Sequence, residues 1–268
     1  MATSVPVLEP PTVAAEIFGD RLPHAIRYAG WLVGPAVERG LIGPREAERV
    51  WQRHIVNCAA VGALIPRTSL VVDLGSGAGL PGLVLAVARP DLRVVLVESM
   101  LRRTTFLDEV VADLDLSNVQ VRRGRVEELT EDKLRADIVT ARAVAPIERL
   151  AAWAAPLLRS GGELLAIKGS GITDEVSAGW RAVRRTGLTD ARLFAVSATG
   201  FDPADAQPQP LMSGTRVTEQ GYWDPSEPGA PFRLRAGDQP PDADRLALVA
   251  ALRRGPQRLS PSADRGLG

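Results

Sequence analysis

The 268-residue chain is 45% hydrophobic, which is enough to bury one large core together with a small appended unit. Its 32 basic and 32 acidic side chains cancel, which excludes a general attraction to nucleic acid, so any such binding must come from a local patch. The one cysteine, Cys58, excludes an internal disulfide or a cysteine-based zinc cluster, and no signal pattern or membrane-length apolar stretch is present, so we expect a soluble cytosolic protein with no membrane and no metal partner.

The N-terminal part of the chain is expected to form a helical cap. Residues 1–11 are punctuated by prolines and are expected to be disordered. Apolar residues at helical spacing predict helices over 13–18 and 22–37. A further helix begins at Pro44 and runs toward Leu64, with a break near Arg53.

The middle of the chain alternates predicted strands and helices. Such alternation is typical of a mainly parallel sheet that is covered on both faces. Ligands of these sheets bind beyond the carboxyl ends of the strands. The predicted strands are 70–73, 93–97, 119–122, 137–140 and 163–167, and the predicted helices are 82–88, 101–114, 147–158 and 173–186.

The C-terminal part breaks this pattern. Its many prolines and glycines and its weak periodicity predict a disordered or loosely folded insertion, and residues 246–252 return as a closing strand or a short helix. The tail after Pro256 is expected to be unstructured. The predicted organisation is a disordered terminus at 1–11, a helical cap at 12–66, an α/β domain at 67–198, the insertion at 199–241, and a closing strand and tail at 242–268.

The run 71–82 is an apolar strand that ends in Asp73 and a glycine-rich turn. Glycines let the backbone turn tightly and approach a ligand, and the helix that opens near Leu80, with Pro81 suited to its first turn, points N–H groups toward it. The run therefore predicts a nucleotide pocket.

Two frames fit this turn. Counted from Gly77, the pattern G-x-G-x-x-G with Glu98 as the later acid predicts an NAD-binding oxidoreductase. Counted from Asp73, the pattern resembles the first motif of class I S-adenosylmethionine-dependent methyltransferases, with Glu98 on the ribose. A carboxylate at Asp73 repels a pyrophosphate but suits a ligand that carries an ammonium and a sulfonium, which favours the second frame.

Further stretches carry a more specific resemblance. In their order and spacing the matching segments resemble the bacterial small-subunit ribosomal RNA guanine-N7 methyltransferases, long called glucose-inhibited division protein B. The resemblance covers about residues 15–190, and a long proline-rich segment between 192–196 and 246–252 departs from the family. The segments are 53–55, 73–82 with Gly79-Leu80-Pro81-Gly82, 101–107, 124–128, 141–143 and 165–169.

The resemblance implies an α/β, class I, Rossmann-like S-adenosylmethionine-dependent methyltransferase, with a mainly parallel sheet and an N-terminal helical cap. It implies methylation at N7 of a guanine (nucleotide 527 in the family) in 16S ribosomal RNA, by a protein that we expect to be a monomer. Residues 67–198 are then the methyltransferase domain. Gly75 and Leu80 would contact the methionine and ribose parts of the cofactor, Val126 and Glu127 would flank the adenine, and Arg142 would line the cofactor and substrate pocket.

Reasoning from the residues adds further candidates. Glu98 can hold both ribose hydroxyls, and Asp73, Gly77 and Gly79 complete the predicted cofactor set. Arg142 has room beside two alanines to meet a carboxylate or a guanine edge, and it is the candidate catalytic residue. The candidates for RNA contact are Arg53, His54, Arg102, Arg103 and Lys168, the last as one of only two lysines.

Each of these candidates has a structural alternative. Glu127 could complement a helix dipole, and Arg142 could form a surface ion pair. His54 could be a packed core histidine, and Glu98 and Lys168 could be solvated strand ends.

The absence of certain catalytic residues narrows the possible methyl-transfer reactions. No cysteine lies at the predicted cleft for C5-pyrimidine methylation, and the fourth strand lacks the Asn/Asp-Pro-Pro-aromatic run of exocyclic-amine methylation. Guanine N7 has a free lone pair and needs no general base, so alignment suffices. The alternatives are a methyltransferase of a small molecule or protein, the oxidoreductase, and a non-catalytic binding module.

Overall fold

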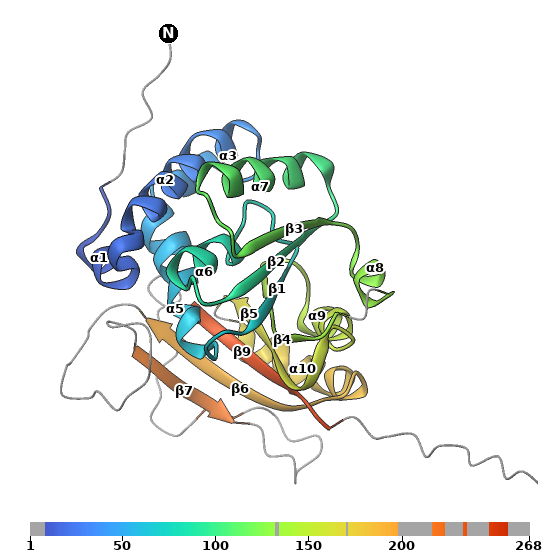
Figure 1. Ribbon diagram of the computed structural model, residues 1–268. Coiled ribbons are helices and arrows are strands. Elements are labelled where there is room, and N and C mark those ends of the chain that lie inside the picture. Colours follow the sequence, from blue (N-terminus) through green and yellow to red (C-terminus); the bar gives the residue numbers. More distant parts are fainter. Residues whose placement is uncertain are drawn as a thin grey trace, which may run out of the picture.

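The computed structural model describes residues 9–131, 134–169, 171–197, 216–222, 233–234 and 247–256. These residues form a nine-stranded sheet in the order β3-β2-β1-β4-β5-β9-β6-β7-β8 (Figure 1). The strands are β1 (Leu70–Leu74), β2 (Arg93–Glu98), β3 (Val119–Arg123), β4 (Ala136–Arg142), β5 (Leu158–Lys168), β6 (Leu188–Ser197), β7 (Arg216–Tyr222), β8 (Arg233–Leu234) and β9 (Ala247–Arg254).

The first five strands are parallel, and β9 lies antiparallel between β5 and β6. The chain leaves β1 toward β2 and β3 on one side and returns to β4 and β5 on the other. This reversal of strand order opens a crevice at the carboxyl ends of β1 and β4, where such sheets bind ligands. The predicted Rossmann-like α/β class with its mainly parallel sheet is confirmed.

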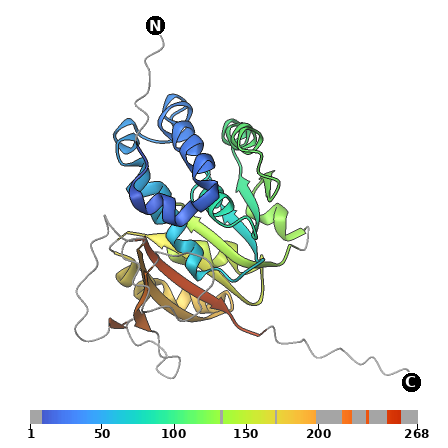
Figure 2. The same ribbon diagram turned by 60° about the vertical axis from the view of Figure 1, so that its left-hand side comes forward.

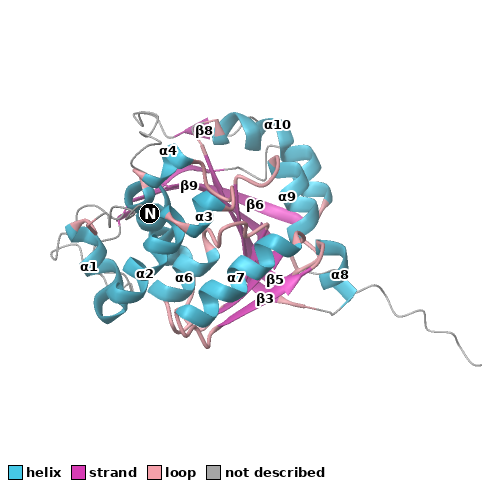
Figure 3. Cartoon of the chain, turned by 90° about the horizontal axis from the view of Figure 1, so that it is seen from above, coloured by secondary structure: helices cyan, strands magenta, loops and turns pink. Residues whose placement is uncertain are grey.

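Helices cover both faces of this sheet, because successive strand residues point to opposite sides. Val71 packs with the N-terminal helices, α6 and α7, whereas Val72 packs with α9 and α10. Figure 2 shows the blue N-terminal helices beside green α7, and Figure 3 shows the strands between the two helical layers. The helices are α1 (Thr12–Phe18), η1 (Gly19–Arg21), α2 (Leu22–Val33), α3 (Pro35–Glu38), α4 (Pro44–Ala47), η2 (Val50–Val56), α5 (Asn57–Ala60), η3 (Val61–Leu64), α6 (Gly82–Ala88), α7 (Leu101–Asp113), α8 (Val126–Glu131), α9 (Ile147–Ala154) and α10 (Ile172–Arg185).

Several predicted helices differ in their bounds. The helix predicted over 22–37 is split at Gly34, since Pro35 has no N–H to continue it and instead begins α3. The helix from Pro44 toward Leu64 is divided into four short pieces, and Arg53 lies inside the π-helix η2. The helix predicted over 147–158 ends at Ala154, two residues before Pro156, and Leu158 already belongs to β5.

The C-terminal part holds strands that the sequence left open. The sequence is compatible with either a strand or a short helix over residues 246–252. The structure has a strand here, β9, which pairs with both β5 and β6. The expectation of a loosely folded 199–241 is wrong for residues 216–222 and 233–234, which pair as β7 and β8. The rest of that segment and the predicted disordered residues 1–8 lie outside the described residues, as does the tail from residue 257.

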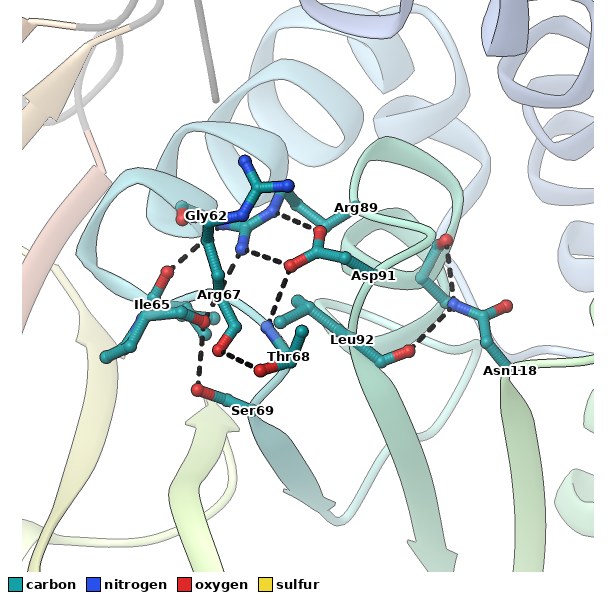
Figure 4. A network of polar contacts seen from close by, with 11 residues as sticks. Gly62, Ile65, Arg67, Thr68, Ser69, Arg89, Asp91, Leu92 and Asn118 are labelled. Carbon is teal, nitrogen blue, oxygen red and sulfur yellow. Dashed lines mark hydrogen bonds and ion pairs between the residues drawn. The ribbon is translucent and has the colours of Figure 1, made fainter. Parts of the chain in front are cut away.

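A buried arginine ties the cap to the sheet at the end opposite the crevice (Figure 4). Arg89, only 2% exposed, donates to the carbonyl oxygens of Gly62 and Ile65 at 2.8 and 3.1 Å and forms a bidentate pair with Asp91 at 2.7 and 2.8 Å. Asp91 in turn accepts from the backbone N–H of Thr68 at 2.9 Å. The end of η3 and the start of β1 are thereby held by one charge pair.

We expect Asp91→Asn to lower the free energy of unfolding at neutral pH by about 2 kcal/mol. The Arg89 guanidinium lowers the pKa of Asp91 from 3.8 to about 2, so this stabilisation is present above pH 3.8 and is lost as the pH falls toward 2. Urea unfolding at several pH values measures both effects. Asp20→Asn, at an exposed acid, is the matched control, and equal stability of Asp91→Asn and the parent chain at neutral pH contradicts the assignment.

Candidate functional site

The glycine turn after β1 uses backbone conformations that favour glycine. Gly75, Gly77 and Gly79 have φ angles of +67°, +57° and +97°. The N–H groups of Gly75 and Ser76 both donate to the Val97 carbonyl oxygen, at 2.9 and 3.1 Å, which holds the turn against the end of β2. A Cβ on Gly77 would meet only the Gly75 carbonyl oxygen, at 3.8 Å, so a ligand can approach the backbone here.

Asp73 braces this turn from below. Its carboxylate is fully buried and accepts from the Thr140 hydroxyl at 3.0 Å and from the Gly82 N–H at 3.1 Å. Burial raises its pKa from 3.8 to about 6, against the lowering by these hydrogen bonds. Both carboxylate oxygens have partners inside the protein, and so does the first N–H of α6, so the structure supports a positioning role for Asp73.

Glu98 connects the turn to the next strand and helix. One carboxylate oxygen accepts from the N–H groups of Ser99 and Met100 at 2.9 and 3.1 Å, and the other from the Gly77 N–H at 3.3 Å. Arg103 lies 3.2 Å from the second oxygen. The carboxylate is therefore fixed at the mouth of the crevice.

A pocket of about 310 Å³ opens in front of these groups. The glycine backbone, a fixed carboxylate and apolar walls are the features that hold a nucleoside, so the residues present fit S-adenosylmethionine. The pocket is lined by Leu74, Gly75, Val97, Glu98, Ser99, Gly124, Arg125, Val126, Val144 and Trp153.

Arg142, at the end of β4, points into the helical cap. Its guanidinium donates to the Cys58 sulfur at 3.0 Å and the Arg53 carbonyl oxygen at 3.1 Å, and it lies 2.7 Å from His54 Nδ1. His54 Nε2 lies 3.1 Å from a Glu46 oxygen, and the other Glu46 oxygen lies 3.3 Å from Arg53. The structure thus brings Arg53, His54 and Arg142 together, but Arg142 is not among the residues that line the pocket, where the resemblance would place it.

The His54 ring is neutral in this arrangement. Burial and the nearby Arg142 lower its pKa from 6.5 to about 4, so at neutral pH Nδ1 is free to accept a hydrogen bond from the Arg142 guanidinium. The histidine therefore holds the arginine, which is a positioning role.

The cap also reaches the glycine turn through a residue that sequence reasoning missed. The hydroxyl of Tyr28, on α2, donates to the Ala78 carbonyl oxygen at 2.7 Å in the buried core. A Cβ on Gly79 would lie 2.9 Å from that hydroxyl, so the glycine allows the tyrosine to fit.

We expect Tyr28→Phe to lower the free energy of unfolding by about 1 kcal/mol, because the Ala78 carbonyl oxygen loses its buried donor. Because that carbonyl belongs to the glycine turn, the affinity for S-adenosylmethionine should fall severalfold as well. Calorimetry measures both. The matched control is Trp31→Phe, which removes a cap hydrogen bond to Asp113 at the end of α7 (2.9 Å) rather than one to the glycine turn, and which should change stability alone. Unchanged cofactor affinity in Tyr28→Phe would contradict a link between this hydrogen bond and cofactor binding.

The remaining sequence candidates lie at different places. Leu80 is half-buried against the core, Val126 lines the pocket, and Glu127 belongs to α8. Arg102 is exposed on the first turn of α7. Lys168 lies apart from the pocket between α9 and α10, where its Nζ donates to the Ala145 carbonyl oxygen at 2.6 Å and to Glu175 at 2.7 Å.

No helix within the described ranges is long and apolar enough to cross a membrane. Across the same part of the chain, no three His, Cys, Asp or Glu side chains gather as metal ligands would.

Comparisons with known proteins show what this chain is similar to. A family model described as rRNA small subunit methyltransferase G matches residues 21–199. Proteins named ribosomal RNA small subunit methyltransferase G from Thermobifida fusca and Salinispora tropica are 54% and 56% identical over 195 and 191 residues, which cover 73% and 69% of this chain and 82% and 79% of theirs. A solved structure, M. jannaschii TYW2 in complex with AdoMet, is 14% identical with a TM-score of 0.45 over 76% of this chain and 77% of its own.

Proposed function

Because the chain belongs to the rRNA small subunit methyltransferase G family, we propose that it transfers a methyl group from S-adenosylmethionine to N7 of a guanine in small-subunit ribosomal RNA. The observation that carries the cofactor assignment is the pocket lined by Gly75 and Glu98, with the glycine turn held against that carboxylate. It lies inside the matched residues 21–199. The family match leaves the oxidoreductase alternative without support.

Methyl transfer to guanine N7 requires mainly that the protein align the two reactants. S-adenosylmethionine supplies a methyl group on a sulfonium; the N7 lone pair forms the new N–C bond, the C–S electron pair stays on sulfur, and no proton has to leave. The protein residues then need only to hold two reactants in line and to tolerate the positive charge that passes to the base.

We assign the roles of the pocket residues as follows. Glu98 would accept hydrogen bonds from the ribose hydroxyls, and the backbone of Gly75 and Gly77 would lie along the methionine part. Val126 and Glu127 would flank the adenine. Support comes from the fixed Glu98 carboxylate and from the open space at Gly77.

Arg142 is proposed to orient the cofactor and the guanine at the end of β4. Its three contacts with the cap fix the guanidinium at the end of β4, which pairs with β1. Asp73, Gly79 and His54 do not line the pocket, and their contacts lie inside the protein, so we propose that they act by positioning.

The residues proposed to contact RNA are fewer than those that the sequence suggests. Arg102 is exposed, so we propose that it meets a phosphate, whereas Arg103 pairs with Glu98 at the pocket mouth and is proposed to hold that carboxylate. Lys168 already has two acceptors, and Arg53 pairs with Glu46, so for these two we propose structural roles.

We further propose that the protein acts as a monomer in the cytoplasm, where ribosomal subunits are found. Sedimentation at micromolar concentration tests the monomer, and a concentration-dependent dimer would contradict it.

Transfer of labelled methyl groups tests the function directly. Small subunits and naked ribosomal RNA from a strain that lacks this gene are incubated with labelled S-adenosylmethionine and the protein. We expect label in the RNA with the parent chain and none with Gly75→Asp, whose side chain would collide with Val144, 3.0 Å from the Cβ position. Binding of S-adenosylmethionine without label in either RNA would refute the proposed acceptor.

A further inference from the structure

Large hydrophobic side chains are exposed at one place in the described part of the chain. They are Met100, Leu101 and Val144, which are 41%, 59% and 37% exposed. Val144 lines the pocket, and Met100 and Leu101 directly follow the lining residue Ser99. Scattered single exposures are ordinary, but exposures gathered around one pocket mark a binding surface.

The local backbone holds these side chains outward. The Met100 N–H donates to Glu98 at 3.1 Å, which fixes the start of α7 and leaves Met100 and Leu101 in solvent. Ala143 has a φ of +55°, which is uncommon for a residue with a Cβ and re-aims the chain at the end of β4. Val144 is thereby set beside the glycine turn, at the Gly75 edge of the pocket.

Cationic side chains stand beside this apolar surface. Arg102 follows Leu101 in the sequence. Arg123 on β3 lies opposite Glu98 on β2 in the backbone pairing of these strands, and Arg125 lines the pocket. All three are exposed, and none has an ion-pair or hydrogen-bond partner for its side chain among the described residues. The Glu128 carboxylate lies beside Gly124, so the three arginines leave an excess of positive charge here. An apolar surface with an excess of positive charge fits a polyanion that also carries flat apolar groups, which describes single-stranded nucleic acid.

We propose that these residues form an RNA-docking rim, defined as Met100, Leu101, Arg102, Arg123, Arg125 and Val144. Met100, Leu101 and Val144 replace the bases that stack on the target guanine, so that this base leaves its stack and enters the pocket. Arg102, Arg123 and Arg125 hold the flanking phosphates. This inference rests on the proposed function and adds to it the surface that takes the RNA and the unstacking of the target base.

Two sets of substitutions separate the parts of the rim. Met100→Ser with Leu101→Ser should raise the half-saturating RNA concentration about tenfold, because two apolar side chains that wedge against the bases are lost. Arg102→Gln with Arg123→Gln and Arg125→Gln should flatten the slope of log binding constant against log salt by roughly 2, at about 0.7 per lost phosphate contact. The Met100/Leu101 variant should bind S-adenosylmethionine as the parent chain does. The arginine variant is compared at saturating S-adenosylmethionine, because Arg125 lines the cofactor pocket.

Arg67→Gln provides the matched control. Arg67 is exposed just before β1, at the opposite end of the sheet, and its side chain has no partner among the described residues (Figure 4). Its substitution should leave the salt slope unchanged.

The outcomes are distinguishable. If the parent chain labels neither RNA nor subunits, the proposed function fails before the rim is tested. If the parent labels RNA and the rim variants match it, the rim proposal is overturned. It is also overturned if the Met100/Leu101 variant loses transfer to assembled subunits but keeps transfer to naked RNA, since the surface would then dock on protein.

Discussion

Replacing Glu98 with glutamine is expected to weaken S-adenosylmethionine binding by about 100-fold, because charged hydrogen bonds are worth roughly 1.5–3 kcal/mol. The amide offers one acceptor oxygen where the carboxylate has two, and those two oxygens already serve the N–H groups of Gly77, Ser99 and Met100. The NH₂ group of the glutamine must therefore face one of these N–H donors. Isothermal titration with the cofactor measures the loss.

Arg103→Gln is the control for this variant. It removes the 3.2 Å ion pair with Glu98 but leaves the carboxylate and its backbone contacts in place. Cofactor affinity should change much less than in Glu98→Gln. Equal losses in both variants would mean that the charge pair, and not the carboxylate itself, shapes the site.

Arg142→Gln is expected to lower kcat for RNA methylation by about 100-fold, because orientation of the reactants carries most of this reaction. The substitution removes the guanidinium that reaches Cys58, His54 and the Arg53 carbonyl oxygen. The effect on the cofactor dissociation constant should be smaller than that on kcat. Single-turnover transfer with saturating RNA separates the two.

Cys58→Ala tests whether the guanidinium or the packing matters. It removes the sulfur that accepts from Arg142 at 3.0 Å but keeps the arginine. We expect kcat near that of the parent chain. A loss as large as that of Arg142→Gln would show that Arg142 acts only by joining the cap to the sheet.

Much of the fold could be predicted because local patterns determine it. The run of short apolar strands separated by helices fixed the parallel sheet, and the glycine run located the crevice. The short helix α8 was missed because its six residues are too few to show a helical period. The mixed strand pairing of β9 depends on contacts with β5 and β6, so residues 246–252 could be assigned to two element types from sequence alone.

The site was harder to predict because its contacts are long-range. Asp73 was expected to face the ligand, but it shares a strand face with Val71, and both lie under α6. That alternation is visible in the sequence and could have indicated a buried carboxylate. Tyr28 lies 50 residues from Ala78, and no local pattern indicates that they meet.

Lys168 illustrates the same limit. Its rarity in an arginine-rich chain suggested RNA contact, but Glu175 on α10 and the Ala145 carbonyl oxygen lie within 2.7 Å of its Nζ. Both partners are set by how α10 folds back against α9, which residue type alone does not reveal.

Nucleoside analysis of ribosomal RNA tests the central claim most directly. Small-subunit RNA is prepared from a strain that lacks this gene, and from that strain carrying either the parent chain or Glu98→Gln. We predict 7-methylguanosine at one guanine in the complemented strain, its absence from the deletion strain, and little or none with Glu98→Gln. An identical 7-methylguanosine content in all three strains would contradict the account.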